Sequence, residues 1–367
     1  MALLKEGDQL RGTYEVERFL GEGAFAEVYR VKHRFLGRQA LKIFKRTGMT
    51  VEEIDEMLGE ATLLSRIGHP NIVRVFDANI VETDRGMCGY FTMEHVPGGT
   101  LDKFWRSHGV QTVPVETSVD LLKQVCRGLL MAHSETPPII HRDIKPQNIL
   151  VGYEAEGLRA RLSDFGLARR VNPLTLLVSA AGTLAFKPPE TFLDPKADSR
   201  AADVYALGVT LYLLLTDQLP YEIDSELGWS DMRAFEKVIL PPSEWNSEAD
   251  AAMDMIVLKC LAREPTARYQ SARELLDGLE SWRKPVKKRL SPVKGLSSEM
   301  SKSVLGAHTP FDQEAAKKRA SESLRIAREE GKLLEAADLM EEAFNQSPSL
   351  RERYASRVRL WRAGISM

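Results

Sequence analysis

The sequence predicts an α+β protein with two lobes, the first rich in strands and the second helical, followed by a further helical segment. Residues 14–96 carry alternating, strand-like patterns around a glycine turn at Gly21 and Gly23. After the Pro-Gly-Gly run at residues 97–99 the pattern changes to long helices. Residues 284–312 are rich in Pro, Ser and Lys, as linkers are. A cleft between the two lobes is therefore expected.

The first lobe is expected to hold strands at residues 14–31, 38–44, 72–81 and 88–96, with a glycine turn inside the first range. A helix is expected over residues 51–67 because apolar side chains recur there at helical spacing. The face they form consists of Ile54, Met57, Leu58, Ala61 and Leu64.

The second lobe is expected to hold helices at residues 115–133, 201–216, 249–262 and 272–282. Helical patterning resumes over residues 313–361, with a turn at Gly331. The predicted division of the chain is a lead-in at 1–13, a two-lobed domain at 14–283, a linker at 284–312 and a helical segment at 313–367.

Composition excludes several classes of function. The 367 residues have a formal net charge of -2, so neither nucleic acid nor an anionic membrane is expected as a partner. The three cysteines are widely spaced, without a metal-binding or disulfide pattern. No signal peptide and no apolar run long enough to span a bilayer are recognised. A cytoplasmic protein is therefore expected.

The glycine turn is the first candidate for chemistry, because glycines let backbone amides approach phosphate oxygens closely. An ordinary hairpin turn is an equally good interpretation of Gly21 and Gly23 taken alone. Lys42 on the following strand favours the phosphate interpretation over that of a solvated strand lysine. Glu60 on the next predicted helix lies at a suitable distance to pair with Lys42 and hold it toward phosphates.

The decisive stretch is HRDIKPQN at residues 141–148, followed by SDFG at residues 163–166. Phosphoryl transfer requires a carboxylate to orient the attacking hydroxyl, and Asp143 supplies one. It also requires hard oxygen ligands for Mg²⁺ and a positive charge near the transferred group. Asn148 and Asp164 are the predicted metal ligands, and Lys145 supplies the charge.

Together these motifs resemble the eukaryotic-type (Hanks-type) Ser/Thr protein kinase family over residues 14–283. The resemblance implies the bilobal kinase fold, with ATP and Mg²⁺ bound in the cleft and protein substrates as acceptors, the enzyme itself among them. It also implies that Lys42 contacts the phosphates and that Asp143 is the catalytic aspartate. A bacterial, cytoplasmic enzyme is expected.

The resemblance further implies an adenine pocket. Met93 is at the gatekeeper position, and Glu94 to Val96 form the hinge. The residues at the pocket walls are Leu20, Val28, Ala40 and Leu150. A stacked apolar column is implied for Leu64, Val75, His141 and Phe165. Plain core packing explains each of these apolar residues equally well.

Residues beyond the catalytic motifs complete the resemblance. Glu190 is expected to pair with Arg268, and Asp203 to brace the catalytic loop. Thr183 is expected to hydrogen-bond toward Asp143 and Lys145. Lys145 and Thr183 together favour serine or threonine over tyrosine as the acceptor.

The chain departs from the family pattern at several positions. Ala26 replaces the third glycine of the loop, Phe186 and Pro188 replace the commoner tyrosine and alanine, and Thr100 replaces an acidic ribose contact. The segment before Glu190 is unusually apolar, so it packs on the domain itself or docks a partner. Arg142 could seat a phosphate there, which predicts autophosphorylation at Thr175 or Ser179.

The C-terminal segment resembles a single tetratricopeptide unit at residues 320–348, with Ala336, Ala343 and Pro348 at the favoured spacings. A plain helical hairpin docked on the kinase domain and a protein-interaction surface both remain open. Two rivals to an active kinase also remain: a pseudokinase scaffold and a nucleotide-gated switch. The complete set of chemical residues argues against the scaffold.

Overall fold

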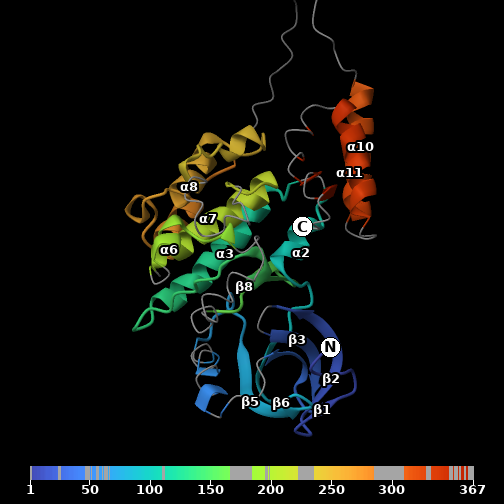
Figure 1. Cartoon of the computed structure of the whole chain (residues 1–367). Coiled ribbons are helices and arrows are strands. Elements are labelled where there is room, and N and C mark those ends of the chain that lie inside the picture. Colours follow the sequence, from blue (N-terminus) through green and yellow to red (C-terminus); the bar gives the residue numbers. More distant parts are fainter. Residues whose placement is uncertain are drawn as a thin grey trace, which may run out of the picture.

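The computed structural model describes residues 2–23, 26–45, 50, 52–54, 58–59, 61, 65, 67–109, 112–165, 184–194, 197, 199–221, 235–284, 310–327, 332–346, 350, 354, 357–358 and 361–362. Figure 1 shows a strand-rich lobe at the bottom, a helical lobe above it, and helices α10 and α11 beside the helical lobe. The two predicted lobes, one strand-rich and one helical, are confirmed.

The first lobe is one antiparallel sheet of strand order β1-β2-β3-β4-β6-β5. Its strands are β1 (Gln9–Leu10), β2 (Tyr14–Glu22), β3 (Ala26–His33), β4 (Gly37–Phe44), β5 (Val75–Thr83) and β6 (Gly86–Glu94). Described residues of the predicted helix over 51–67 are helical at 52–54, 58–59, 61 and 65.

Strand β4 directs Lys42 toward the helical lobe. Side chains alternate along a strand, so residues two apart share a face. Leu41 and Ile43 point into the core that the N-terminal residues cover. Ala40 and Phe44 point into the core on the other side, which continues into the helical lobe. Lys42 lies between Ala40 and Phe44 on this second face, toward the lobe that carries the catalytic loop.

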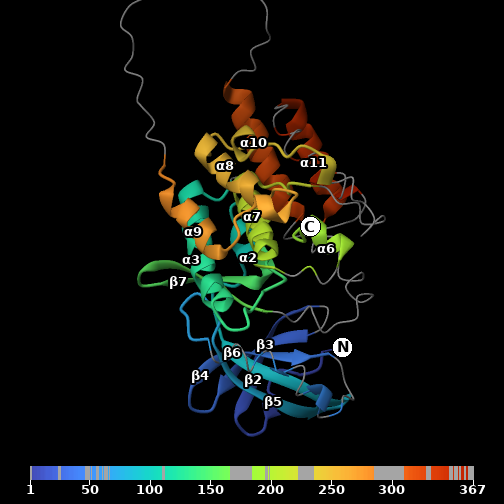
Figure 2. The same ribbon diagram turned by 90° about the vertical axis from the view of Figure 1, so that its left-hand side faces the viewer.

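The second lobe is built on helices and a two-stranded hairpin. Its elements are α2 (Leu101–Arg106), α3 (Val115–His133), η1 (Pro146–Asn148), β7 (Ile149–Glu154), β8 (Gly157–Leu162), α6 (Pro189–Leu193), α7 (Arg200–Thr216), η5 (Pro242–Glu244), α8 (Ala251–Cys260), η6 (Pro265–Ala267) and α9 (Ala272–Ser281). Helix α7 is buried from Ala201 to Thr216 and forms the centre of the lobe. Figure 2 shows α3, α8 and α9 around it.

The joint between the lobes is tightly packed. A Cβ added to Gly98 would lie 2.1 Å from the carbonyl oxygen of Val151 in β7. The Val151 amide donates to the carbonyl of Gly99 at 2.8 Å, and Thr100 forms an isolated bridge with Leu150. The glycines that mark this joint in the sequence therefore permit close contact between the joint and the helical lobe.

The C-terminal helices have a core of their own. Helices α10 (Pro310–Arg325) and α11 (Leu333–Gln346) pack through small residues, with Ala336 and Ala343 fully buried. Further members of this core are Ala320, Leu324, Met340, Leu350, Tyr354, Val358 and Trp361. Arg357 approaches Asp217 at the end of α7, with 3.5 Å between Nη1 and Oδ2. Helix α10 begins at Pro310, inside the predicted linker.

Helix α2 was not predicted, because six residues are too few to show a period. Strand β5 runs two residues further than its predicted end at residue 81, and β6 stops at Glu94. Among the described residues, no helix combines the length and the apolar character that a membrane crossing needs.

Candidate active site

The catalytic loop holds the Asp143 carboxylate from two sides. The Lys145 ammonium lies 2.9 Å from Asp143 Oδ2. The Asn148 side-chain amide donates to the same oxygen at 2.8 Å and to the Asp143 carbonyl at 2.8 Å. Charge-assisted hydrogen bonds of this kind fix a carboxylate in one orientation. The structure therefore brings together three of the predicted residues: Asp143, Lys145 and Asn148.

Backbone contacts connect this loop to Asp164. The carbonyl of Asn148 accepts from the Ser163 amide at 2.9 Å and from the Ser163 hydroxyl at 3.1 Å. Asn148 and Ser163 adjoin the paired strands β7 and β8, where Ile149 lies opposite Leu162. Asp164 follows Ser163 directly. Asn148 just before β7 and Asp164 just after β8, the two predicted metal ligands, therefore lie at the same end of the hairpin.

Lys42 reaches across from β4 to this end of the hairpin. Its Nζ lies 2.5 Å from Asp164 Oδ1, and its side chain is only 9% exposed. A lysine with so little water around it needs a charged partner, and Asp164 is that partner in the structure. Glu60, the predicted partner, is outside the described residues.

His141 and Asp203 attach the loop to the helical lobe. The Asp203 carboxylate accepts the amides of His141 at 2.8 Å and Arg142 at 2.9 Å, which confirms the predicted brace. It also contacts His133 Nε2 at 2.9 Å. Asp203 is 1% exposed, so its charge acts in a medium that screens it little.

His141 is the neutral anchor of the loop. Burial lowers the pKa of His141, and nearby carboxylates oppose that shift only in part. Its Nδ1 accepts from the Asp143 amide at 3.3 Å, so its Nε2 donates to the Ser163 carbonyl at 2.9 Å. The His141 ring packs on Phe165 with 4.4 Å between centroids. Val75 of the predicted apolar column is buried, and Leu64 lies outside the described residues.

Two residues of the site have left-handed backbone conformations. Arg142 has a φ of 68° and Asp164 a φ of 60°. Non-glycine residues adopt this region at an energetic cost, and such positions cluster at functional sites. At Arg142 the surrounding contacts include the Lys187 ammonium, which donates to the Arg142 carbonyl at 2.6 Å.

The residues of the predicted adenine pocket come from strands β2, β3, β4, β6 and β7 and from Val96 just after β6. Gly21 pairs with Val28 across β2 and β3, and Val28 pairs with Lys42 across β3 and β4. Ala40, Met93 and Val96 are buried, whereas Leu20, Val28 and Leu150 are half-buried. Ala40 of β4 lies directly opposite Met93 of β6, the predicted gatekeeper. The Gly23 amide donates to the Ala26 carbonyl at 2.8 Å and closes the glycine turn.

The ion pair of Glu190 and Arg268 is confirmed. Both guanidinium ends of Arg268 reach the Glu190 carboxylate at 2.7 Å, and the Arg268 side chain is fully buried. Thr183, Thr175 and Ser179 are outside the described residues, so the predicted acceptor contact and autophosphorylation sites stay predictions. Phe186 is buried, and Thr100 caps α2 by accepting the Lys103 amide at 3.3 Å.

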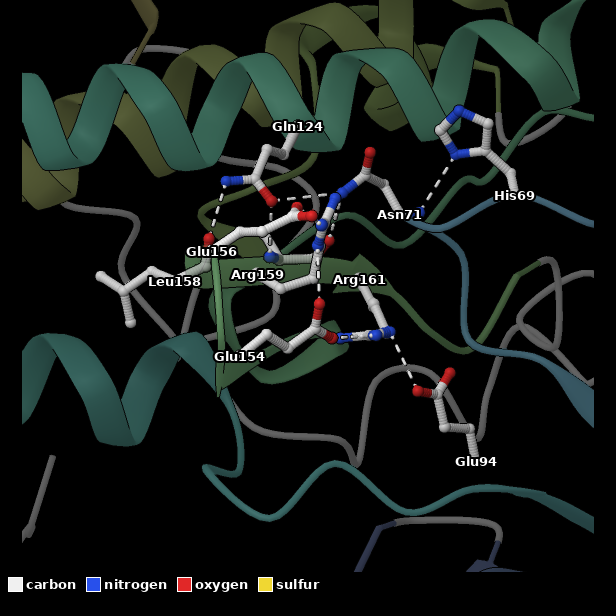
Figure 3. Close-up of polar contacts among 10 residues, drawn as sticks. His69, Asn71, Glu94, Gln124, Glu154, Glu156, Leu158, Arg159 and Arg161 are labelled. Carbon is white, nitrogen blue, oxygen red and sulfur yellow. Dashed lines mark hydrogen bonds and ion pairs between the residues drawn. The ribbon is translucent and has the colours of Figure 1, made fainter.

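Sequence reasoning missed a group of polar residues behind the joint. Figure 3 shows Asn71, Gln124, Glu94, Glu154, Arg159 and Arg161 gathered around β8. The Asn71 amide donates to the Ala160 carbonyl at 2.8 Å and to Gln124 Oε1 at 3.2 Å. These partners lie far apart in sequence, so periodicity carries no signal for them. Two arginines that alternate with apolar residues in β8 were the one available hint.

Known proteins resemble this chain over most of its strand-rich and helical lobes. The protein kinase domain family matches residues 14–278. The chain is 31% identical to the serine/threonine-protein kinase PknB of Mycobacterium leprae over 271 residues, 72% of this chain and 42% of that protein. PknB of Mycobacterium tuberculosis is 32% identical over 272 residues, with the same coverage. The chain thus spans about 40% of the length of the curated relatives that it matches.

A solved structure shows the same fold. The crystal structure of the PknI kinase domain of Mycobacterium tuberculosis aligns with a TM-score of 0.56 and 27% sequence identity, covering 76% of this chain and 98% of that one. A second crystal structure, of a mutant form of the same domain, aligns with a TM-score of 0.57.

Proposed function

This chain belongs to the protein kinase family, and we propose that it transfers the γ-phosphate of ATP to serine or threonine hydroxyls of proteins. The observation that carries the proposal is the carboxylate of Asp143, which Lys145 and Asn148 hold at 2.9 and 2.8 Å. A carboxylate fixed in this way can accept or orient the proton of an attacking hydroxyl. Lys145 lies where charge develops on the transferred group.

The donor set suits Mg²⁺. The Asn148 amide nitrogen donates to Asp143, so its side-chain oxygen would bind the metal. Asp164 Oδ1 accepts from Lys42, and its second carboxylate oxygen would bind the metal. Magnesium is typically held by one or two protein oxygens together with substrate phosphates, so no larger acidic cluster is needed. When bound, Mg²⁺ would neutralise phosphate charge, and Lys42 would exchange part of its contact with Asp164 for phosphate oxygens.

The adenine end is assigned to the joint between the lobes. Ala40, Val28, Leu20 and Leu150 would enclose the base, with Met93 at the back. Backbone groups from Glu94 to Val96 would hydrogen-bond it. Gly21 and Gly23 would cover the phosphates, because a Cβ added to Gly21 meets no atom within 4 Å.

Serine and threonine are proposed as acceptors on two grounds. Lys145 stands two residues after Asp143 and contacts it directly. The PknB relatives are named serine/threonine-protein kinases. Thr183 and Glu60 are proposed to complete the site, the first beside Lys145 and the second beside Lys42. Autophosphorylation at Thr175 or Ser179 is part of the proposal.

Acid hydrolysis of the labelled product tests the choice of acceptor. The purified chain is incubated with Mg²⁺ and ATP labelled at the γ-phosphate, with a general acceptor protein present. Phosphoserine and phosphothreonine are expected among the products. Phosphotyrosine as the main product would overturn the choice of acceptor, and no incorporation at all would overturn the transfer.

The C-terminal helices are proposed to form a tetratricopeptide-like unit that binds a protein partner. The buried alanines of α10 and α11 support close helix packing of that kind. A cytoplasmic location is proposed because ATP is the substrate and the three cysteines are unpaired. Comparing a chain that lacks residues 310–367 with an Asp143→Ala chain in cells would separate recruitment from catalysis.

A further inference from the structure

A chain of ion pairs runs behind the joint between the lobes. Arg161 of β8 places its Nε 3.1 Å from Glu94 Oε1, at the end of β6. The Arg161 Nη2 bonds the carboxylate of Glu154 at the end of β7. Figure 3 shows Arg161 between these two carboxylates, with Arg159 on the far side of Glu154. One guanidinium therefore joins the hinge of the first lobe to the hairpin of the second.

This contact differs from an ordinary surface ion pair. The Arg161 side chain is 13% exposed and that of Glu94 is 32% exposed. The hydrogen bond from Arg161 is the largest cause of the lowered pKa of Glu154, so the contact favours the charged carboxylate. Exposed pairs contribute little, but a shielded guanidinium shared between two carboxylates loses much when one partner is removed. The link between Arg161 and Glu94 is therefore expected to restrain both strands.

Both strands lead into the proposed nucleotide site. Glu94 follows Met93, and its amide donates to the Arg74 carbonyl at 2.9 Å. From Arg161 in β8 the chain reaches Asp164 in three residues. The segment before β5 fixes β8 in place, because Val73 donates to the Leu162 carbonyl and Leu162 donates to the Asn71 carbonyl, each at 2.9 Å. Arg161 thus attaches the hinge to a strand that is already fixed.

We propose that Arg161 is a positioning residue for the nucleotide, an inference that rests on the proposed ATP site. By holding the Glu94 side chain, it keeps the hinge backbone at one distance from Asp164. The adenine contacts at the hinge and the metal contact at Asp164 then fit one nucleotide together. Without the link the two ends of the site move independently, and ATP loses affinity while the orientation of Asp143 is kept.

Arg161→Met tests this, with Arg159→Met as the matched control. Arg159 lies on the same strand and face and pairs with Glu154 at 3.1 Å and Glu156 at 2.9 Å, neither of them in the hinge. ATP affinity is measured by calorimetry with Mg²⁺ present, and KM and kcat are measured in parallel. In Arg161→Met, Kd and KM for ATP are expected to rise about fivefold, the size of a broken contact within a network. The kcat of Arg161→Met, and all three constants of Arg159→Met, are expected to stay at wild-type values.

Glu94→Gln breaks the same ion pair from its other end and keeps both the hinge backbone and the Arg161 side chain. Glu94→Gln is expected to raise the Kd for ATP. The double variant Glu94→Gln, Arg161→Met is expected to bind ATP with the same Kd as Arg161→Met alone. Equal Kd values for Arg161→Met and Arg159→Met, additive effects in the double variant, or a change confined to kcat would overturn the positioning role. Wild-type protein that bound no ATP would instead overturn the proposed function, and this inference with it.

Discussion

Asn148 donates its side-chain amide to both the backbone carbonyl and the carboxylate of Asp143, each at 2.8 Å. One residue therefore fixes the catalytic carboxylate and directs its own oxygen elsewhere. The Asn148 carbonyl in turn accepts from Ser163, the neighbour of Asp164. Hydrogen bonds thus join the proposed base to Asn148, and Asn148 to the residue that precedes the second proposed metal ligand, Asp164.

Replacing Asn148 is expected to affect metal use and transfer together. Asn148→Ala removes a proposed ligand and frees the Asp143 carboxylate, so the Mg²⁺ concentration for half-maximal activity should rise about 10-fold or more. A magnesium titration of the initial rate measures this. Asn246→Ala is the control, because Asn246 is a buried asparagine that bonds the Leu215 carbonyl away from the site. An unchanged magnesium requirement in Asn148→Ala would remove Asn148 from the metal site.

Glu190→Gln is expected to destabilise the helical lobe. The change leaves the buried Arg268 without its charged partner, which costs about 3 kcal/mol of unfolding free energy in a buried pair. Chemical denaturation measures the difference. Glu280→Gln breaks the pair with Arg127, whose side chain is 47% exposed, and should cost less than about 1 kcal/mol. Similar losses in the two variants would contradict a special role for the buried pair.

Gly98→Ala is expected to disturb the joint between the lobes. The new methyl group would lie 2.1 Å from the Val151 carbonyl oxygen, so the backbone must shift, at a cost of about 1–3 kcal/mol. Thermal unfolding and ATP affinity should both decrease. Gly68→Ala is the control, since a Cβ there meets no atom within 4 Å. Wild-type stability in Gly98→Ala would show that the joint is less rigid than described.

Mild acid is expected to weaken the fold through His141. Its pKa is lowered in the folded protein from an ordinary value of 6.5. The unfolded chain therefore takes up a proton that the folded one resists, and stability falls as pH decreases from about 7 to 5. His141→Gln should make that pH dependence shallower. Part of the pH dependence should remain in that variant, because burial also lowers the pKa values of His69 and His95. Identical slopes for wild type and His141→Gln would contradict this account.

The fold was largely predictable because its elements are long and regular. Helix α3 was predicted with its observed bounds because its buried side chains recur on one face. The catalytic loop was predictable because its chemistry occupies eight consecutive residues. Helix α2 escaped prediction because it is short, and the extent of β5 depended on its pairing with β6.

Partners that no family motif marks could not be predicted when they lie far apart in the sequence. The contact of Lys42 with Asp164, 122 residues away, was not predicted, and its predicted pairing with Glu60 stays a prediction because Glu60 lies outside the described residues. Both carboxylates suit a lysine in the cleft, so charge and spacing do not decide between them. The ion pair of Arg161 and Glu94 depends on how β8 lies behind the hinge, and no local pattern encodes that placement.

Asp143 is assigned to phosphate transfer and not to nucleotide binding. Measuring the rate of phosphate transfer and the Kd for ATP in one preparation of Asp143→Asn tests this assignment most directly. In Asp143→Asn the rate is expected to fall about a thousandfold, within the range of a lost general base, while the Kd for ATP stays within about twofold of wild type. Transfer within about tenfold of the wild-type rate would contradict the assignment of Asp143 as the catalytic aspartate.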